Sequence, residues 1–254
     1  MQAIKTIAIT GKGGTGKTAI ATLLIKQLAE RFDKVLAIDA DSAMSLPYTL
    51  GIKVEKTVSD IRKELIGSQQ AKKMLLESGP TKTVMRKILS HGEGFDLLAM
   101  GRPEEPGCFC AVNDLLRYGI DTLISDYDIA VIDGEAGPEQ LNRRVLKSID
   151  VLLVVADMSL RSLETAASII KVAEGYDSEV RVKKAGLVLN RVREDKPAQE
   201  MLDKIGLEVF GWLPEDKSIN EFDRAGRSLL ELAPDSPCPR AVRTILEKIL
   251  SESM

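Results

Sequence analysis

Short apolar runs alternate along the chain with longer stretches whose apolar residues recur at helical spacing. Most runs are apolar nearly throughout, which is typical of parallel strands covered on both faces. They are Thr6–Thr10, Val35–Ile38, Leu97–Met100, Ile129–Ile132, Val151–Ala156 and Ala185–Leu189. Helical spacing recurs in Thr18–Glu30, Leu163–Glu174 and Ala198–Ile205. This alternation predicts an α/β fold with a doubly wound, mainly parallel sheet flanked by helices.

The stretch Val54–His91 departs from this alternation. Its helical patterns are broken by Gly67, Gly79 and Pro80, and we expect it to lie outside the sheet. No repeat, low-complexity tract or linker divides the 254 residues, so we expect one domain over 1–254.

Composition narrows the range of partners. A net charge of −3 and an aromatic content of 4% argue against nucleic acid as the main partner. No apolar run approaches the roughly 18 residues of a membrane span, and the first residues do not form a signal peptide. We therefore expect a cytoplasmic protein without a membrane partner. Because thiols stay reduced in that compartment, closely spaced cysteines predict a metal or redox site before a disulfide.

A phosphate-binding motif follows the first predicted strand. Residues 11–18, GKGGTGKT, fit the pattern G-x-x-x-x-G-K-[ST] and precede a predicted helix. The backbone that can turn its N–H groups toward phosphates comprises Gly11, Gly13, Gly14, Thr15 and Gly16. Lys17 can reach the β and γ phosphates of ATP, and the Thr18 hydroxyl can ligate Mg²⁺.

Carboxylates follow two other predicted strands, at the edge where open α/β sheets bind ligands. Asp39 and Asp41 end the second run, and Asp133 ends the fourth. Phosphoryl transfer needs one carboxylate near Mg²⁺ and one near the attacking water. Gly134 and Gly137 flank an acidic turn, where a glycine N–H can approach the γ-phosphate and distinguish ATP from ADP.

Polar residues also end the last strands. Asn190 and Arg191 close the run AGLVLN, while Pro214, Glu215 and Asp216 follow VFGW. Their spacing alone identifies two polar strand exits at the predicted ligand edge.

The second lysine of the phosphate loop, Lys12, makes the motif resemble the deviant Walker A motif of MinD-type ATPases. That resemblance implies a homodimer in which Lys12 touches the nucleotide of the other subunit. It also implies that Asp41 positions the water and that Asp39 supports Mg²⁺. At the adenine side, it implies that Asn190 reads the base, helped by Arg191 and residues 214–216. Ser42 stands where the family often has proline, which predicts a more flexible loop.

Two cysteines, Cys108 and Cys110, are one residue apart in PGCFC. In extended chain both side chains would lie on one face, and a disulfide between them would be strained. Two thiolates cannot close a tetrahedral metal site, but two copies of the pair across a twofold axis supply four. The alternative is a pair of small buried apolar side chains. We interpret Cys238, between two prolines, as structural or incidental, with a reactive surface thiol as the alternative.

A narrower resemblance follows from GRPEEPGCFC, AVNDLLR, DGEAGPEQLNRR and LRSLETA. These stretches look like the CooC and AcsF group of nickel-insertion ATPases. The resemblance implies a dimeric ATPase that binds Ni²⁺, or Zn²⁺ in its place, through paired C-x-C motifs. It further implies that ATP hydrolysis is coupled to nickel insertion into a client, carbon monoxide dehydrogenase or acetyl-CoA synthase.

Three other functions stay open. A positioning ATPase of the MinD or ParA type would act on a membrane or on DNA. The chain's last apolar stripe lacks the basic face of a membrane helix, and we expect it to dock on the protein's own core. It comprises Val242, Ile245, Leu246, Ile249 and Leu250. An iron–sulfur ATPase is disfavoured because no cysteine lies between Asp133 and Cys238. A metal-binding scaffold without turnover is disfavoured by the complete phosphate-loop motif.

Overall fold

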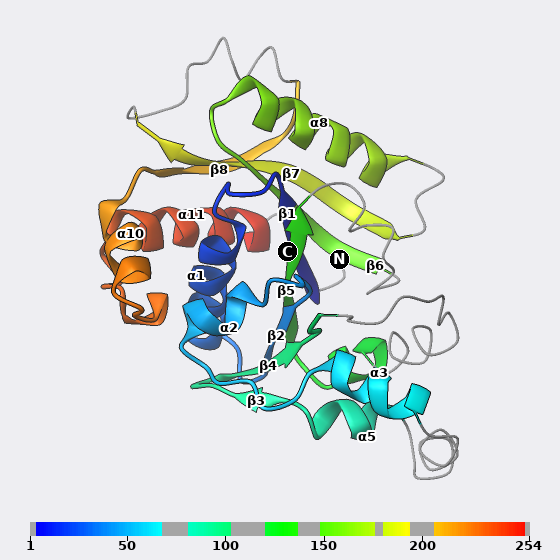
Figure 1. Ribbon diagram of the computed structural model, residues 1–254. Helices are drawn as coiled ribbons and strands as arrows, with labels where there is room; N and C mark the ends of the chain where they lie inside the picture. The colour runs from blue at the N-terminus through cyan, green and yellow to red at the C-terminus, as the bar shows by residue number, and fades with distance from the viewer. Residues whose placement is uncertain are drawn as a thin grey trace.

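The computed structural model describes residues 4–67, 81–102, 120–136, 148–175, 180–193 and 206–251. Within these ranges the strands form one eight-stranded sheet in the order β3-β4-β2-β5-β1-β6-β7-β8 (Figure 1). All neighbouring pairs are parallel except β3 and β4. The strands are β1 (Thr6–Gly11), β2 (Val35–Asp39), β3 (Ser90–His91), β4 (Phe95–Ala99), β5 (Ile129–Ala136), β6 (Ser148–Ala156), β7 (Arg181–Val192) and β8 (Val209–Pro214).

Helices cover both faces of this sheet (Figure 1). The helices α1 and α11 pack on one face, while α8 packs on the other. The labelled helices are α1 (Lys17–Ala29), α2 (Ser45–Leu50), α3 (Val58–Gly67), α5 (Thr81–Arg86), α8 (Leu160–Glu174), α10 (Lys217–Arg224), the short 3₁₀ helix η1 (Leu229–Glu231) and α11 (Pro237–Ser251), and residues 120–124 are also helical.

The central strand β1 shows why the runs are continuously apolar. All six of its residues are buried. Ile7 and Ile9 face the layer of α1 and α11, while Ala8 faces the layer of α8. Because successive side chains of a strand point to opposite faces, a strand covered on both sides needs apolar residues at every position. The doubly wound parallel fold expected from the sequence is thus confirmed.

One prediction about Val54–His91 is wrong at its end. Ser90 and His91 form β3, an antiparallel edge strand in which Ser90 lies opposite Leu97 and His91 opposite Asp96. A strand of two residues shows no periodicity, and its place in the sheet depends on the neighbour it pairs with. The predicted helix Ala198–Ile205 lies outside the described residues.

The C-terminal apolar stripe docks on the protein itself. Val242, Ile245, Leu246 and Ile249 are buried in the same layer as the core of α1, and Leu250 is packed against it. This confirms the expectation that the stripe covers the chain's own core. Among the described residues, we find no helix with the length and apolar character needed to cross a bilayer.

Candidate nucleotide site

The loop between β1 and α1 adopts a conformation that only glycine accommodates easily. Gly14 and Gly16 have φ angles of 79° and 92°. Gly11 has φ 145°, and a Cβ there would lie 2.1 Å from the carbonyl oxygen of Val155 on β6. Side chains at these positions would either strain the backbone or collide with the neighbouring strand. The glycines of the motif therefore serve the shape of the loop.

Hydrogen bonds within the loop hold this shape. The Lys12 carbonyl accepts bonds from the Thr15 hydroxyl at 2.8 Å and from Lys17 Nζ at 3.3 Å. The side-chain amide of Asn190, from β7, donates to the Thr15 carbonyl at 2.7 Å. Thr15 and Lys17 are buried. These hydrogen bonds fix the conformation of the phosphate loop, and β7 supports it.

The predicted carboxylates meet beside this loop. Asp39 and Asp133 are direct neighbours in the register of β2 and β5. The oxygens of Asp39 accept bonds from the N–H groups of Asp41 at 2.9 Å and Leu46 at 3.2 Å. Both oxygens of Asp133 are buried and have no hydrogen-bond partner.

Burial dominates the electrostatics of these carboxylates. The pKa of Asp133 is raised to about 7, mainly by burial and in addition by the Asp39 carboxylate, while Thr18 and Lys17 oppose the shift. The Thr18 hydroxyl thus acts on Asp133 without reaching ordinary hydrogen-bond geometry. Burial likewise raises the pKa of Asp39 to about 6.

Lys17 lies within the field of the same carboxylates. Burial lowers the pKa of Lys17, and the nearby Asp133 and Asp41 carboxylates partly offset that effect. A buried carboxylate without a hydrogen-bond donor is stabilised by a cation placed against it. Asp133 together with the Thr18 hydroxyl therefore fits an Mg²⁺ ion, whose ligands in proteins are oxygens.

Two loops at this edge are joined by a backbone donor. The N–H of Ser42, which follows β2, donates to the Glu135 carboxylate on β5 at 3.2 Å. Proline at position 42 could not make this bond, because it has no N–H. The Thr10 hydroxyl donates to the Glu135 carbonyl at 3.3 Å. The loop after β2, expected to be more flexible without proline, is thus tied to the end of β5, and the acidic turn expected at Gly134 is still part of that strand.

The structure adds Asp157, which the sequence analysis missed. Asp157 directly follows β6, next to β1 in the sheet. Burial acts to raise the pKa of Asp157. The pKa nevertheless lies below its usual range, because Asp157 accepts hydrogen bonds from the hydroxyl and N–H of Ser159 and lies near the charges of Lys12 and Arg191. The signal was available, since an acid directly after an apolar strand also marked Asp39.

The residues predicted at the adenine side are partly engaged with one another. The side-chain amide oxygen of Asn190 accepts a bond from the Arg191 N–H, and Arg191 has a positive φ of 57°. Glu215 forms an ion pair with Arg193 at 2.8 Å. The roles of Asn190, Arg191 and Pro214 in binding a base stay predictions.

Asp216 has a local structural role. One carboxylate oxygen caps α10 by accepting bonds from the N–H and hydroxyl of Ser218, and the other accepts a bond from the Cys238 N–H. A carboxylate at this N-cap satisfies backbone donors of the first helical turn. Its contribution to a nucleotide site would therefore be to position the loop before it.

The cysteines divide into two groups. Cys108, Cys110 and the predicted sensor Gly137 lie outside the described residues. Cys238 is buried, and burial raises the pKa of its thiol to about 12. The surface-thiol alternative for Cys238 is wrong. Among the residues that the structure describes, no three His, Cys, Asp or Glu side chains are grouped as a metal ion would require.

Residues 6–229 match the family model of the CobQ/CobB/MinD/ParA nucleotide-binding domain. The chain belongs to this family. The match spans the phosphate loop, the carboxylates of β2 and β5, and the end of β8. Membership in this family identifies the site around the phosphate loop as a nucleotide site of the P-loop class.

Relatives in this family are similar over almost the whole chain. An uncharacterized ATP-binding protein of Methanocaldococcus jannaschii is 42% identical over 97% of this chain and 98% of its own. The carbon monoxide dehydrogenase accessory protein CooC of Rhodospirillum rubrum is 28% identical over 90% of each chain. Among solved structures, the septum site-determining protein MinD complexed with Mg-ADP from Pyrococcus horikoshii has a TM-score of 0.71 and 22% identity, covering 98% of this chain and 97% of the other.

Proposed function

We propose that this chain is an ATP-hydrolysing metallochaperone that binds Ni²⁺, or Zn²⁺ in its place. In this proposal it couples ATP turnover to nickel insertion into a client enzyme, carbon monoxide dehydrogenase or acetyl-CoA synthase. The observation that carries the proposal is the Cys108-Phe109-Cys110 sequence in a chain that aligns with CooC over 90% of its length.

The nucleotide half of the proposal rests on the charges around Lys17. Thr18 and Asp133 would hold Mg²⁺, which neutralises phosphate charge when bound. Lys17 would face the β and γ phosphates, and the Asp41 carboxylate would orient the attacking water. Support comes from the buried Asp133 carboxylate, whose oxygens have no other partner, and from the solved Mg-ADP complex of a protein with the same fold.

The metal half of the proposal requires two chains. Lys12 would reach the nucleotide of the partner subunit in a homodimer that both ATP and the cargo metal favour. Two copies of Cys108 and Cys110 would then supply four thiolates to one cargo ion. Thiolates suit Ni²⁺ and Zn²⁺ and select against Mg²⁺, so the cargo and the nucleotide metal would use separate sites. Hydrolysis would change the distance between the two pairs and release the cargo.

The mass of the protein with and without added metal tests this proposal directly. We expect reduced wild-type protein to double its mass by light scattering on adding NiCl₂, with about one metal per two chains, as a shared four-ligand site demands. The Cys108→Ser/Cys110→Ser variant should stay monomeric and bind no metal. Cys238→Ser is the matched control, because it removes a thiol outside the proposed site and should behave as wild type. If the double variant dimerises and binds metal as wild type does, the C-x-C pair does not hold the cargo.

Steady-state ATP hydrolysis tests the nucleotide site separately from the cargo-metal site. Lys17→Ala should abolish ATP hydrolysis while leaving metal binding intact, because Lys17 is predicted to contact the phosphates of ATP and not the cargo metal. Cys108→Ser should spare hydrolysis in metal-free protein. Loss of nucleotide binding in Cys108→Ser would contradict the separation of the sites.

A further inference from the structure

Among the residues that the structure describes, no strand pairs with the outer edge of β8. It is the last strand in the order and pairs there with β7. Its sequence, VFGWLP, contains no charged residue and has its one proline at the last position, whereas exposed edge strands are usually protected by charge, by prolines along the strand or by a covering segment. Trp212 is 40% exposed on this strand. Lys248 Nζ donates to the Val209 carbonyl at 2.8 Å and so covers one end of the edge.

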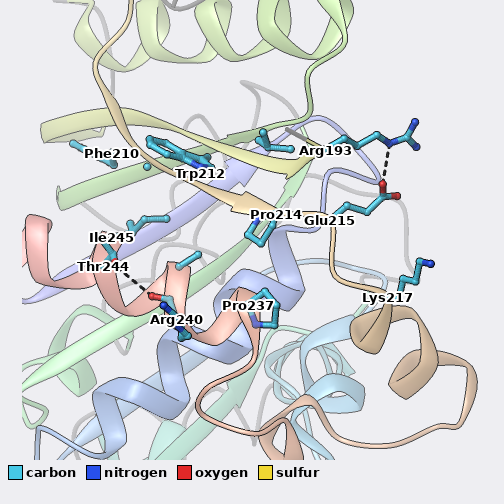
Figure 2. Close-up of a pocket in the computed structure, with 13 residues that line it drawn as sticks. Arg193, Phe210, Trp212, Pro214, Glu215, Lys217, Pro237, Arg240, Thr244 and Ile245 are labelled. Carbon is cyan, nitrogen blue, oxygen red and sulfur yellow. Dashed lines mark hydrogen bonds and ion pairs between the residues drawn. The ribbon is translucent and has the colours of Figure 1, made fainter. Parts of the chain in front are cut away.

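A groove runs between this edge and α11. Its volume is about 860 Å³, within the range of sites that bind ligands. Figure 2 shows Trp212 and Pro214 on the strand side, with Thr244 and Ile245 on the helix side. At Gly211 a Cβ would lie 2.5 Å from Ile245, so glycine keeps that part of the strand close to the helix. The floor of the groove is therefore apolar and extended along β8.

The polar residues of the groove have an excess of positive charge. Three cations, Arg193, Lys217 and Arg240, and one carboxylate, Glu215, line it. The Arg193 side chain is paired with Glu215. Lys217 and Arg240 are exposed, and neither has an acidic partner among the residues that the structure describes. The net charge of the whole chain is −3, so this local excess of cations is a property of the groove.

We propose that this groove binds an extended acidic segment of a partner protein. The segment would add to the open edge of β8 through main-chain hydrogen bonds, as extended peptides do at exposed edges. An apolar side chain of the segment would pack against Trp212 and Ile245. A carboxylate would face Lys217 and Arg240. A strand edge favours a peptide over a compact ligand, because its donors and acceptors repeat along one line.

Selection from a random library tests the chemistry without a known partner. Random dodecapeptides displayed on phage would be selected on wild-type protein after depletion on the Lys217→Glu/Arg240→Glu variant. We expect enriched peptides to combine Asp or Glu with β-branched or aromatic residues. Because Trp212 is the single tryptophan of the chain, a synthetic enriched peptide should shift the protein's tryptophan emission in a saturable manner.

The variants make the test specific. The charge-reversed double variant should bind the enriched peptide about tenfold or more weakly, since charged contacts in a complementary site contribute on this scale. Lys87→Glu, a reversal at an exposed lysine after α5, should bind it as wild type does. Lys17→Ala should also bind it normally, so that failure of the nucleotide proposal would leave this result unaffected. Thermal melts should show that the exposed substitutions leave the fold intact.

Several results would overturn this proposal. One is the absence of enrichment, and another is enrichment of peptides that lack acidic residues or bind the double variant equally. If ADP shifts Trp212 emission and displaces the peptide, the groove is the base end of the nucleotide site. If raising the protein concentration without peptide shifts the Trp212 emission and increases the mass of the protein together, a second copy of the chain occupies the groove.

Discussion

At the scale of single residues, Gly16 shows how closely the phosphate loop is fitted to its surroundings. Its φ is 92°, and a Cβ would lie 2.3 Å from the side-chain nitrogen of Asn190. That nitrogen donates to the Thr15 carbonyl. A side chain at position 16 would therefore disturb the loop in two ways, through backbone strain and through displacement of its support from β7.

Gly16→Ala should lower the affinity for a non-hydrolysable ATP analogue by about tenfold or more, which corresponds to about 1.4 kcal/mol. The left-handed conformation alone costs an alanine about 1–2 kcal/mol, and the clash with Asn190 adds to it. Isothermal titration calorimetry measures the affinity. Gly206→Ala is the control, because Gly206 has φ 61° with nothing within 4 Å of a Cβ. Equal affinities for Gly16→Ala and wild type would show that the loop adapts without Asn190.

At the scale of elements, the start of α3 is stabilised by reciprocal hydrogen bonds. Asp60 accepts bonds from the N–H of Thr57 at 2.8 Å and from its hydroxyl at 2.7 Å. The Asp60 N–H donates to the Thr57 hydroxyl at 3.2 Å. This arrangement satisfies backbone donors that the first turn leaves free. The hydrogen bonds from Thr57 hold the pKa of Asp60 below its usual value.

Thr57→Ala should lower the free energy of unfolding by about 1 kcal/mol at pH 7, the typical value of a lost N-cap. Because the pKa of Asp60 is lower in the folded than in the unfolded state, its contribution is present above the unfolded value of 3.8 and is lost as pH falls through the folded value. The difference from wild type should shrink below about pH 4. Urea denaturation from pH 7 to pH 3 measures both effects. Thr57→Ser should restore most of the stability, and a Ser variant as unstable as Ala would rule out the hydroxyl as the cause.

At the scale of the whole molecule, the carboxyl ends of the central strands bring Lys12 and Asp157 together. Lys12 is partly exposed, its carbonyl is held by Thr15, and its charge acts on Asp157. The bonds to its carbonyl fix the backbone of Lys12. In the homodimer that we propose, the Lys12 side chain would contact the nucleotide of the partner subunit.

Lys12→Ala should keep binding a non-hydrolysable ATP analogue but should not dimerise with it. The reason is that Lys12 supplies its backbone to the loop and, in our proposal, its charge to the other subunit. Light scattering with and without the analogue measures the mass. Lys87→Ala should dimerise as wild type does. An equally dimeric Lys12→Ala would contradict the role of Lys12 across the interface.

Several features followed from local sequence. The phosphate loop is contiguous, so its glycines, Lys17 and Thr18 could be recognised from spacing alone, and the structure gives that loop the backbone conformation that glycine requires. Apolar runs in the sequence predicted the strands of a sheet covered on both faces, because a doubly covered strand has no polar positions. The carboxylates Asp39 on β2 and Asp133 on β5 followed from the same signal, because each ends an apolar run.

Other features depended on contacts between distant segments. The pairing of Asp39 with Asp133, the support of Thr15 by Asn190 and the place of Asp157 near Lys12 arise from strand order and register. The two-residue strand β3 and the groove beside β8 depend on which element lies next to them. The sequence by itself determined the class of the fold and the chemistry of the phosphate loop, because both depend on residues that are close together in the chain. Only the tertiary structure decided which charged side chains lie together and that β8 is the last described strand of the sheet, because both depend on packing between distant segments.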